Sequence, residues 1–273
     1  DFVGAIFITG PSASGKTTFS KRLESVLTGA GYNAYVISID DFYRDRDDIH
    51  RLEIECGIVP PDAEEFDYET IAAFDVPFFR EQMQAFLRRE EVELPLYDFP
   101  AGKRITSGKR LRRRGNDLLI VEGIQAMNPA MCDGLNFSKK LNVYICPFDI
   151  FCADCGEKVI TTQQLRFMRR CIRDISSRDA SVRRTMGMWN AVRLGEEKYI
   201  KPMKKYADFF FNSALEYEIA FYSKRMSELR NNLETDELAA LSEIINFDAL
   251  GCFLPCEDID FPAGSIFGEF YMK

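Results

Sequence analysis

The sequence GPSASGKT, residues 10–17, matches the pattern G-x-x-x-x-G-K-[ST] in full. It follows the apolar run 3–9, which predicts a buried strand, and it overlaps the start of 16–29, which predicts an amphipathic helix. A strand before and a helix after is the context in which this pattern forms a phosphate-binding loop, or P-loop. We therefore expect this segment to decide the fold and to hold the phosphates of a nucleotide.

The residue types of this loop fit phosphate binding. Gly10 and Gly15 let the backbone curl so that its N–H groups face the phosphates, and the positive end of the following helix attracts them. Lys16 can reach the β- and γ-phosphate oxygens, and Thr17 offers a hydroxyl to Mg²⁺. The predicted nucleotide-binding residues are Gly10, Pro11, Ser12, Ala13, Ser14, Gly15, Lys16, Thr17 and Thr18.

The composition is that of a globular protein with an acidic balance. The chain has 273 residues, of which 46% are hydrophobic, and a formal net charge of −8 at pH 7. This length suffices for one large domain or two small ones, and the negative charge argues against a broad nucleic-acid surface. No apolar run approaches the roughly 20 residues that span a bilayer, and we see no secretory signal. We expect a cytoplasmic enzyme with no membrane partner.

Eight cysteines are spread along the chain rather than gathered in one short segment. Reduced thiols of a cytosolic protein account for this pattern. The alternative is a zinc site made by Cys152 and Cys155 together with Cys252 and Cys256. These two pairs lie far apart in the sequence, and no histidine lies near them. The spacing therefore favours free thiols over a metal site.

Predicted strands alternate with predicted helices, which favours an α/β fold with a mostly parallel sheet. The predicted strands are 3–9, 34–39, 118–121, 141–145 and 207–211, and the predicted helices are 16–29, 69–90, 162–177, 181–201, 215–231 and 236–246. Residues 44–66 predict a loop or short helices. We expect one P-loop kinase domain over residues 1–273. Its predicted parts are a β-hairpin at 93–115, a helical lid at 162–200, and C-terminal helices with a tail at 215–273.

Acidic residues follow two of the predicted strands. Asp40 and Asp41 end the second strand, and Glu122 ends the third. Ligands of open parallel sheets bind beyond the carboxyl ends of the strands, so we expect these side chains near the γ-phosphate. Glu122 and Asp40 can join Thr17 in holding Mg²⁺, and Asp40 can accept the proton of an acceptor hydroxyl. Alternatively, Asp40 and Asp41 only cap the next helix.

The predicted helix 162–177 carries an apolar stripe and a separate face of arginines. The stripe consists of Leu165, Met168, Ile172 and Ile175, and the arginines are Arg166, Arg169, Arg170 and Arg173. Arginines that close over a transferring phosphoryl group stabilise its charge. We therefore expect this helix to form part of a lid, and the alternative is a solvated basic face.

Eight segments, in this order, resemble the uridine kinase and phosphoribulokinase family. They are GPSASGKTTF (10–19), SIDDFYRDRD (38–47), FDYE (66–69), LPLYDFPAGKR (94–104), NDLLIVEGI (116–124), LRFMRRCIRD (165–174), MWNAVRLGEEKYI (188–200) and ADFFFNSALEYE (207–218). The chain is most similar to the bacterial uridine kinase-like branch. In that branch a region similar to threonyl-tRNA synthetase often precedes the kinase, so we expect Asp1 to mark where such a region was removed. The resemblance implies a P-loop fold of the nucleoside-monophosphate-kinase type.

The resemblance also implies roles for matching positions. Asp40 matches the acid that activates the acceptor hydroxyl, and Arg169 and Arg173 match catalytic positions of the lid helix. Candidate substrate-binding residues are Tyr43, Phe66, Asp67, Tyr97, Arg166 and Arg193. The implied cofactors are ATP and Mg²⁺. The implied activity is phosphoryl transfer to a small alcohol, with the 5′-hydroxyl of uridine or cytidine as the first candidate.

The acceptor region departs from the family pattern. Uridine–cytidine kinases carry a base-contacting histidine where this chain reads DFPAGKR, residues 98–104. The single histidine, His50, lies in a charged segment and is expected at the surface. Loss of a base-reading group weakens the nucleoside assignment but leaves phosphoryl transfer intact. A sugar phosphate, pantothenate or a glycerate-type alcohol is therefore the alternative acceptor.

Two further classes of function stay open. Residues 103–114 contain seven lysines and arginines that could bind RNA. No aromatic side chain interleaves with them, and Thr106-Ser107-Gly108 suits the turn of an exposed hairpin, so nucleic acid is disfavoured as a partner. The chain could also be a regulatory module that binds ATP without transfer, which would not need a carboxylate at Asp40. Relatives form dimers or tetramers, so a homo-oligomer also stays open.

Overall fold

The computed structural model describes residues 3–57, 60, 67–115, 117–148, 151–152, 158–177, 180–256, 261–262 and 264–270. The chain forms two compact units whose segments alternate along the sequence. The first unit comprises Asp1–Pro11, Phe19–Tyr144 and Arg193–Phe210, and the second comprises Ser12–Thr18, Ile145–Val192 and Phe211–Lys273. The single kinase domain expected over residues 1–273 therefore stays a prediction.

A mainly parallel sheet of five strands has the order β2-β5-β1-β6-β9. The strands are β1 (Ala5–Thr9), β2 (Ala34–Ser38), β5 (Leu118–Glu122), β6 (Lys140–Cys146) and β9 (Phe209–Asn212). β1 pairs in parallel with both β5 and β6, and β2 pairs in parallel with β5. Every residue of β1 and β5 is buried, as expected for central strands of a sheet covered on both faces. The α/β fold predicted from the alternating pattern is confirmed.

Helices that lie in the first unit follow the strands of this sheet. They are α1 (Lys16–Gly29), the 3₁₀ turn η1 (Ile39–Phe42), α2 (Arg46–Glu55), the 3₁₀ turn η2 (Ile71–Ala73), α3 (Val76–Leu87) and α4 (Pro129–Cys132), except that the first three residues of α1, Lys16–Thr18, belong to the second unit. The single helix predicted over 69–90 is therefore interrupted. Asp75 caps α3 by accepting a hydrogen bond from the N–H of Phe78 at 3.2 Å, and a proline stands in the first turn. Both features start a helix, so α3 begins there.

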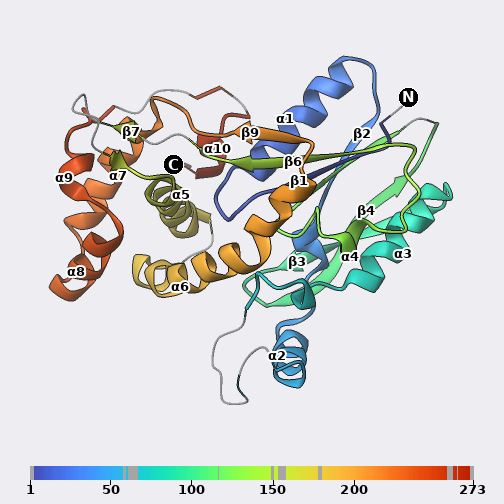
Figure 1. The fold of residues 1–273 in the computed structure, drawn as a ribbon, viewed down its shortest axis with the longest axis horizontal. Helices are drawn as coiled ribbons and strands as arrows, with labels where there is room; N and C mark the ends of the chain where they lie inside the picture. The colour runs from blue at the N-terminus through green and yellow to red at the C-terminus, as the bar shows by residue number, and fades with distance from the viewer. Residues whose placement is uncertain are drawn as a thin grey trace. The chain divides into compact units, whose positions relative to one another are not determined.

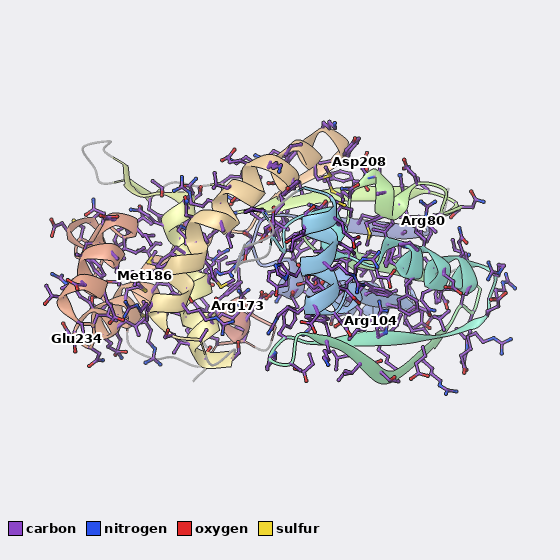
Figure 2. The ribbon with its side chains drawn as sticks, turned by 90° about the horizontal axis from the view of Figure 1, so that it is seen from below. Arg80, Arg104, Arg173, Met186, Asp208 and Glu234 are labelled. Atoms are coloured by element: carbon purple, nitrogen blue, oxygen red, sulfur yellow. The ribbon has the colours of Figure 1, made fainter. Side chains whose placement is uncertain are left out.

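A two-stranded hairpin packs beside α3 (Figure 1). It consists of β3 (Glu91–Asp98) and β4 (Lys103–Arg112), paired antiparallel. The turn predicted at Thr106-Ser107-Gly108 is wrong, because these residues lie inside β4, where Thr106 is opposite Pro95. The turn is at 99–102 instead. Arg104, labelled in Figure 2, holds the hairpin to α3 through an ion pair of 2.9 Å with Asp75.

Helices and two short strands build the second unit. They are β7 (Phe151–Cys152), β8 (Lys158–Ile160), α5 (Thr162–Ser177), α6 (Val182–Gly195), α7 (Glu218–Arg230), α8 (Thr235–Ile244), α9 (Phe247–Leu250) and α10 (Phe267–Phe270). The helix predicted over 181–201 ends early as α6, and the π-helical turn η3 (Glu196–Ile200) and the 3₁₀ helix η4 (Lys201–Tyr206) follow it. α5 and α7 lie side by side in Figure 1 and share one apolar core.

The arginine face predicted for α5 is buried rather than solvated. Arg166 is 1% exposed and Arg169 is 0% exposed. The apolar stripe holds for Leu165, Met168 and Ile172, which are buried, whereas Ile175 is 37% exposed. None of the described helices is long and apolar enough to cross a membrane.

Candidate phosphate-binding and acceptor site

The loop from Gly10 to Gly15 joins β1 directly to α1, as the sequence predicts. Its backbone is curled: φ is 58° at Ala13 and 86° at Gly15. A left-handed conformation is costly for alanine and natural for glycine. A Cβ atom at position 15 would also lie 2.9 Å from Cδ1 of Ile266. The loop therefore needs glycine at position 15 and something that holds Ala13 in place.

The predicted ligands Lys16, Thr17 and Thr18 form the first turn of α1. Backbone N–H groups of a first turn have no partner within the helix, and the helix dipole attracts anions to them. The N–H of Thr18 donates to Oε2 of Glu269 at 3.1 Å, and the hydroxyl of Thr18 donates to the same oxygen at 2.5 Å. A carboxylate therefore lies at a position where the sequence predicts a phosphate.

Glu122 and Asp40 lie at one edge of the sheet in the first unit. Glu122 is opposite both Ile8 on β1 and Ser38 on β2, and it is buried. Asp40 follows Ser38 by two residues and is half-buried in η1. The hydroxyl of Ser38 accepts from the N–H of Asp40 at 3.4 Å and caps η1. Because the caps of η1 and α2 are Ser38 and Asp45, the capping role considered for Asp40 and Asp41 is wrong.

Tyr43 and Tyr97 belong to a buried aromatic cluster in the first unit. The ring of Tyr43 stacks on Phe74 with centroids 4.2 Å apart and lies 5.4 Å from that of Tyr97. Phe99 lies 5.1 Å from Tyr97, at the end of β3. The hydroxyl of Tyr97 is buried without a hydrogen-bond partner among the described residues, and burial raises the pKa of Tyr97 to about 12. The structure thus brings two of the predicted acceptor residues together.

The other predicted acceptor residues are placed differently. Asp67 accepts a hydrogen bond from the N–H of Glu69 at 3.1 Å, and its own N–H donates to Glu53 at 3.1 Å. Burial raises the pKa of Glu53, and the N–H of Asp67 opposes this rise. Arg193 is exposed in the last turn of α6. Phe66 lies outside the described residues.

The arginines of α5 have partners within the second unit. Arg170 donates to the hydroxyl of Ser12 in the P-loop at 2.7 Å and approaches Asp174 at 3.3 Å. Arg173, labelled in Figure 2, pairs with Asp174 at 2.9 Å. The guanidinium of Arg166 lies 5.9 Å from the ring of Trp189. α5 is therefore linked to the P-loop by polar contacts of its arginines.

Two carboxylates that were not among the predicted site residues contact this region. Glu218 forms a buried ion pair with Arg169 at 2.7 Å, and Glu269 contacts Thr18. Glu218 is the last residue of a segment that carries the family resemblance, 207–218. That resemblance is the sequence feature that could have identified it. Glu269 lies in the predicted C-terminal tail, and its partner could not be predicted from the sequence.

Metal ligation by the cysteines is not supported where the structure is described. No group of three or more His, Cys, Asp or Glu side chains that could hold a metal occurs among the described residues. Cys252 and Cys256 are free thiols. Cys155 and the side chain of Cys152 lie outside the described part of the chain. For Mg²⁺, the hydroxyl of Thr17 and the carboxylate of Glu122 are oxygen ligands of the kind this ion prefers.

The comparisons by sequence agree on one family. The model of the phosphoribulokinase / uridine kinase family matches residues 5–220. A uridine kinase of Lactobacillus johnsonii is 27% identical over 216 residues, which cover 79% of this chain and 89% of that protein. A uridine kinase of Leuconostoc citreum is 29% identical over 205 residues, which cover 74% and 84%. The solved YGR205w protein shares the fold, with a TM-score of 0.50 and 18% identity over 76% of this chain and 81% of that chain.

Proposed function

The chain belongs to the phosphoribulokinase / uridine kinase family and is an ATP-dependent kinase, and from this we propose that it transfers the γ-phosphoryl group of Mg²⁺-ATP to the 5′-hydroxyl of uridine or cytidine. The family model covers the P-loop, both strand-end acids and the arginines of α5. The uridine kinases that resemble the chain support a nucleoside as the first acceptor to test.

The proposal rests on how β5 pairs with its two neighbours, β1 and β2. Glu122 is opposite Ile8, and β1 runs from there through Thr9 into Gly10, the first residue of the P-loop. Glu122 is also opposite Ser38, two residues before Asp40. Two carboxylates therefore lie at the sheet edge from which the phosphate-binding loop departs. A loop that only held nucleotide would not require an acid in the position of Asp40.

The proposed roles follow from the chemistry of each side chain. Lys16 binds and neutralises the β- and γ-phosphate oxygens. Thr17 and Glu122 would hold Mg²⁺, which when bound neutralises the charge that develops on the phosphates. Asp40 accepts the proton of the acceptor hydroxyl. At the same time the oxygen of that hydroxyl forms a bond to the γ-phosphorus, and the bond between the γ-phosphorus and the leaving ADP oxygen breaks.

The aromatic cluster supports an acceptor with a flat ring. Phe99 is 40% exposed and offers a ring surface beside Tyr97, whereas Tyr43 and Tyr97 are each 5% exposed and pack behind it. The hydroxyl of Tyr97, which has no hydrogen-bond partner among the described residues, is the group that we assign to a polar atom of the substrate. Phe99 occupies the stretch in which related kinases carry a base-contacting histidine. A different alcohol therefore stays the alternative acceptor, and the experiment must include it.

An acceptor screen tests the proposal. ADP release from Mg²⁺-ATP is measured with uridine, cytidine, pentose phosphates, pantothenate and glycerate, against a reaction without acceptor. Acceleration by uridine or cytidine that is lost in Asp40→Asn is the expected result. A signal from another alcohol alone would overturn the nucleoside assignment. No signal from any acceptor, with ATP binding intact, would overturn transfer and favour a nucleotide-binding regulatory module.

A further inference from the structure

Arg169 uses all of its hydrogen-bond donors inside the second unit. A guanidinium has five N–H donors. Nε donates to Oε2 of Glu218 at 2.9 Å, and Nη2 donates to Oε1 of Glu218 at 2.7 Å and to the carbonyl of Ser213 at 2.7 Å. Nη1 donates to the carbonyl of Ala13 at 3.3 Å and to the hydroxyl of Ser213 at 3.4 Å. These five acceptors leave no donor for a transferring phosphoryl group.

Glu218 keeps this arginine charged although both side chains are 0% exposed. Burial alone lowers the pKa of Arg169, but the negative charge of Glu218 opposes it and the net pKa is raised. Glu218 is the first residue of α7, where the helix dipole favours an anion, and it also accepts from the N–H of Leu215 at 2.8 Å. Arg169 and Glu218 are therefore buried together as a paired set of charges.

The contact with Ala13 has a direct effect on the P-loop. In a planar trans peptide the carbonyl of one residue and the N–H of the next point in opposite directions. An arginine that holds the carbonyl of Ala13 therefore fixes the direction of the N–H of Ser14. This hydrogen bond supports a residue in a costly conformation, because Ala13 is left-handed with a φ of 58°. Arg170, on the same helix, fixes the hydroxyl of Ser12.

We propose that Arg169 is a positioning residue. It sets the N–H of Ser14 for a nucleotide phosphate through the carbonyl of Ala13, and Glu218 is the counter-ion that makes this possible. This proposal rests on the proposed function, since it assumes that the P-loop binds nucleotide. It replaces the catalytic contact with the phosphoryl group that the family resemblance implies for Arg169.

The experiment compares Glu218→Gln, Arg169→Lys and Ser213→Ala with the wild type. Calorimetry gives the Kd for Mg²⁺-ADP, and steady-state kinetics give KM for ATP and kcat. Glu228→Gln is the matched control, because it removes a carboxylate from an exposed ion pair of the same helix α7. Ser213→Ala removes only one weak acceptor and keeps the ion pair, so it provides a mild variant if the others fail to fold.

We expect Glu218→Gln and Arg169→Lys to raise the Kd for ADP and KM for ATP about tenfold, the effect of one misplaced hydrogen bond to a charged group. Their kcat at saturating ATP should fall less than about threefold. An arginine that touches the phosphoryl group would instead lower kcat by about 10³-fold. That result, or an unchanged Kd in both variants with a lowered melting temperature, would overturn the positioning role. A wild type that does not bind ADP would overturn the proposed function itself.

A separate contact concerns Thr18 and the C-terminal segment. One oxygen of Glu269 accepts from both the N–H and the hydroxyl of Thr18. Buried aromatic side chains hold the segment: Phe267 and Phe270 are buried, and Phe261 stacks on Phe267 with centroids 4.3 Å apart. The neighbouring Ile266 lies against Gly15. Glu269 is therefore fixed on the loop by contacts on both sides of it.

From this contact we infer that Glu269 competes with a nucleotide phosphate for Thr18, so that the C-terminal segment is autoinhibitory. A phosphate oxygen and a carboxylate oxygen need the same two donors, and their like charges repel. Binding of nucleotide would thus require Glu269 to leave. This inference also rests on nucleotide binding by the P-loop, but on a different residue from the role of Arg169.

Glu269→Gln tests the competition, with Glu228→Gln again as control. We expect the Kd for Mg²⁺-ADP to fall about tenfold, because the amide removes the charge repulsion and accepts the hydrogen bonds more weakly. Hydrogen exchange of the segment 264–270 should accelerate when ADP is added to the wild type. Weaker or unchanged ADP binding by Glu269→Gln would overturn the inference. The two proposals predict opposite changes in Kd, so each can fail without the other.

Discussion

Oδ1 of Asp41 accepts a hydrogen bond from the backbone N–H of Tyr97 at 3.2 Å. Asp41 lies in η1 after β2, and Tyr97 lies near the end of β3, so the bond joins two elements that are far apart in the sequence. The acid beside Asp40 thus positions the strand that carries a predicted acceptor residue. Burial raises the pKa of Asp41, and the bond from Tyr97 partly opposes this rise.

The raised pKa gives Asp41 a defined effect on stability. An acid with a higher pKa in the folded state binds its proton more tightly when folded. Its contribution to the free energy of unfolding is therefore greatest below the ordinary value of 3.8 and falls as pH rises through the raised value. Asp41→Asn keeps an oxygen acceptor for Tyr97 but has no proton to lose. We expect this variant to lack that fall in urea unfolding measured from pH 3.5 to 7.

Asp48→Asn is the control for this series, since Asp48 pairs with Arg51 on the exposed side of α2. It should retain the pH dependence of the wild type. An identical decline in the free energy of unfolding for Asp41→Asn and the wild type would show that Asp41 does not titrate as its surroundings imply.

Asp40→Asn is expected to lower kcat by at least about 10²-fold, the usual contribution of a positioned general base. The amide cannot accept the proton of the acceptor hydroxyl, whereas ATP binding depends on other residues. The measurement is steady-state ADP release together with the Kd for ATP, again with Asp48→Asn as control. An unchanged kcat would place the base elsewhere.

Lys16→Ala is expected to abolish transfer, because no other residue of the P-loop motif supplies a positive charge to the phosphates. Lys21→Ala is a matched control, as Lys21 is exposed on the same helix. Both variants are assayed for ADP release with the acceptor that the screen identifies. Near-normal turnover by Lys16→Ala would refute the phosphate-binding role of the loop.

Tyr97→Phe separates substrate binding from stability. Removing a buried hydroxyl that has no hydrogen-bond partner among the described residues is expected to leave the free energy of unfolding within about 1 kcal/mol of the wild type. If this hydroxyl pairs with the acceptor, KM for the acceptor should rise about tenfold while KM for ATP stays constant. Tyr32→Phe, at an exposed position, is the control. An unaltered KM for the acceptor would show that the hydroxyl of Tyr97 does not contribute to acceptor binding.

Local sequence signals predicted the sheet and the P-loop well. Short apolar runs predicted β1, β2, β5 and β6 to within about two residues, and glycine or acids mark the ends of the first three, because these signals depend on neighbouring residues. The turn of the hairpin was misplaced. Thr106-Ser107-Gly108 suits a turn by composition, but pairing with β3 keeps these residues extended. Strand pairing is a tertiary effect that local propensity does not contain.

Local sequence patterns could not predict what surrounds the arginines of α5. Their spacing gave the correct helix and a separate arginine face, yet the sequence could not show that Glu218 would meet Arg169 in the core. The two residues are 49 positions apart. A buried arginine is acceptable only with a partner, and that partner comes from another helix. Burial and pairing, rather than secondary structure, set the role that we propose for Arg169.

Gly123 follows Glu122 at the end of β5 and has a φ of 154°. A Cβ atom there would lie 2.0 Å from Cγ1 of Ile39, the residue before Asp40. Gly123→Ala must therefore strain the backbone and displace Ile39, and we expect it to lower the free energy of unfolding by about 2–5 kcal/mol. Because Ile39 adjoins Asp40, kcat should fall as well.

Gly187→Ala is the matched control, since nothing lies within 4 Å of a Cβ there in α6. That substitution should stabilise the protein by about 0.5–1 kcal/mol, and equal urea midpoints for the two variants would contradict the close approach of Ile39 to Gly123.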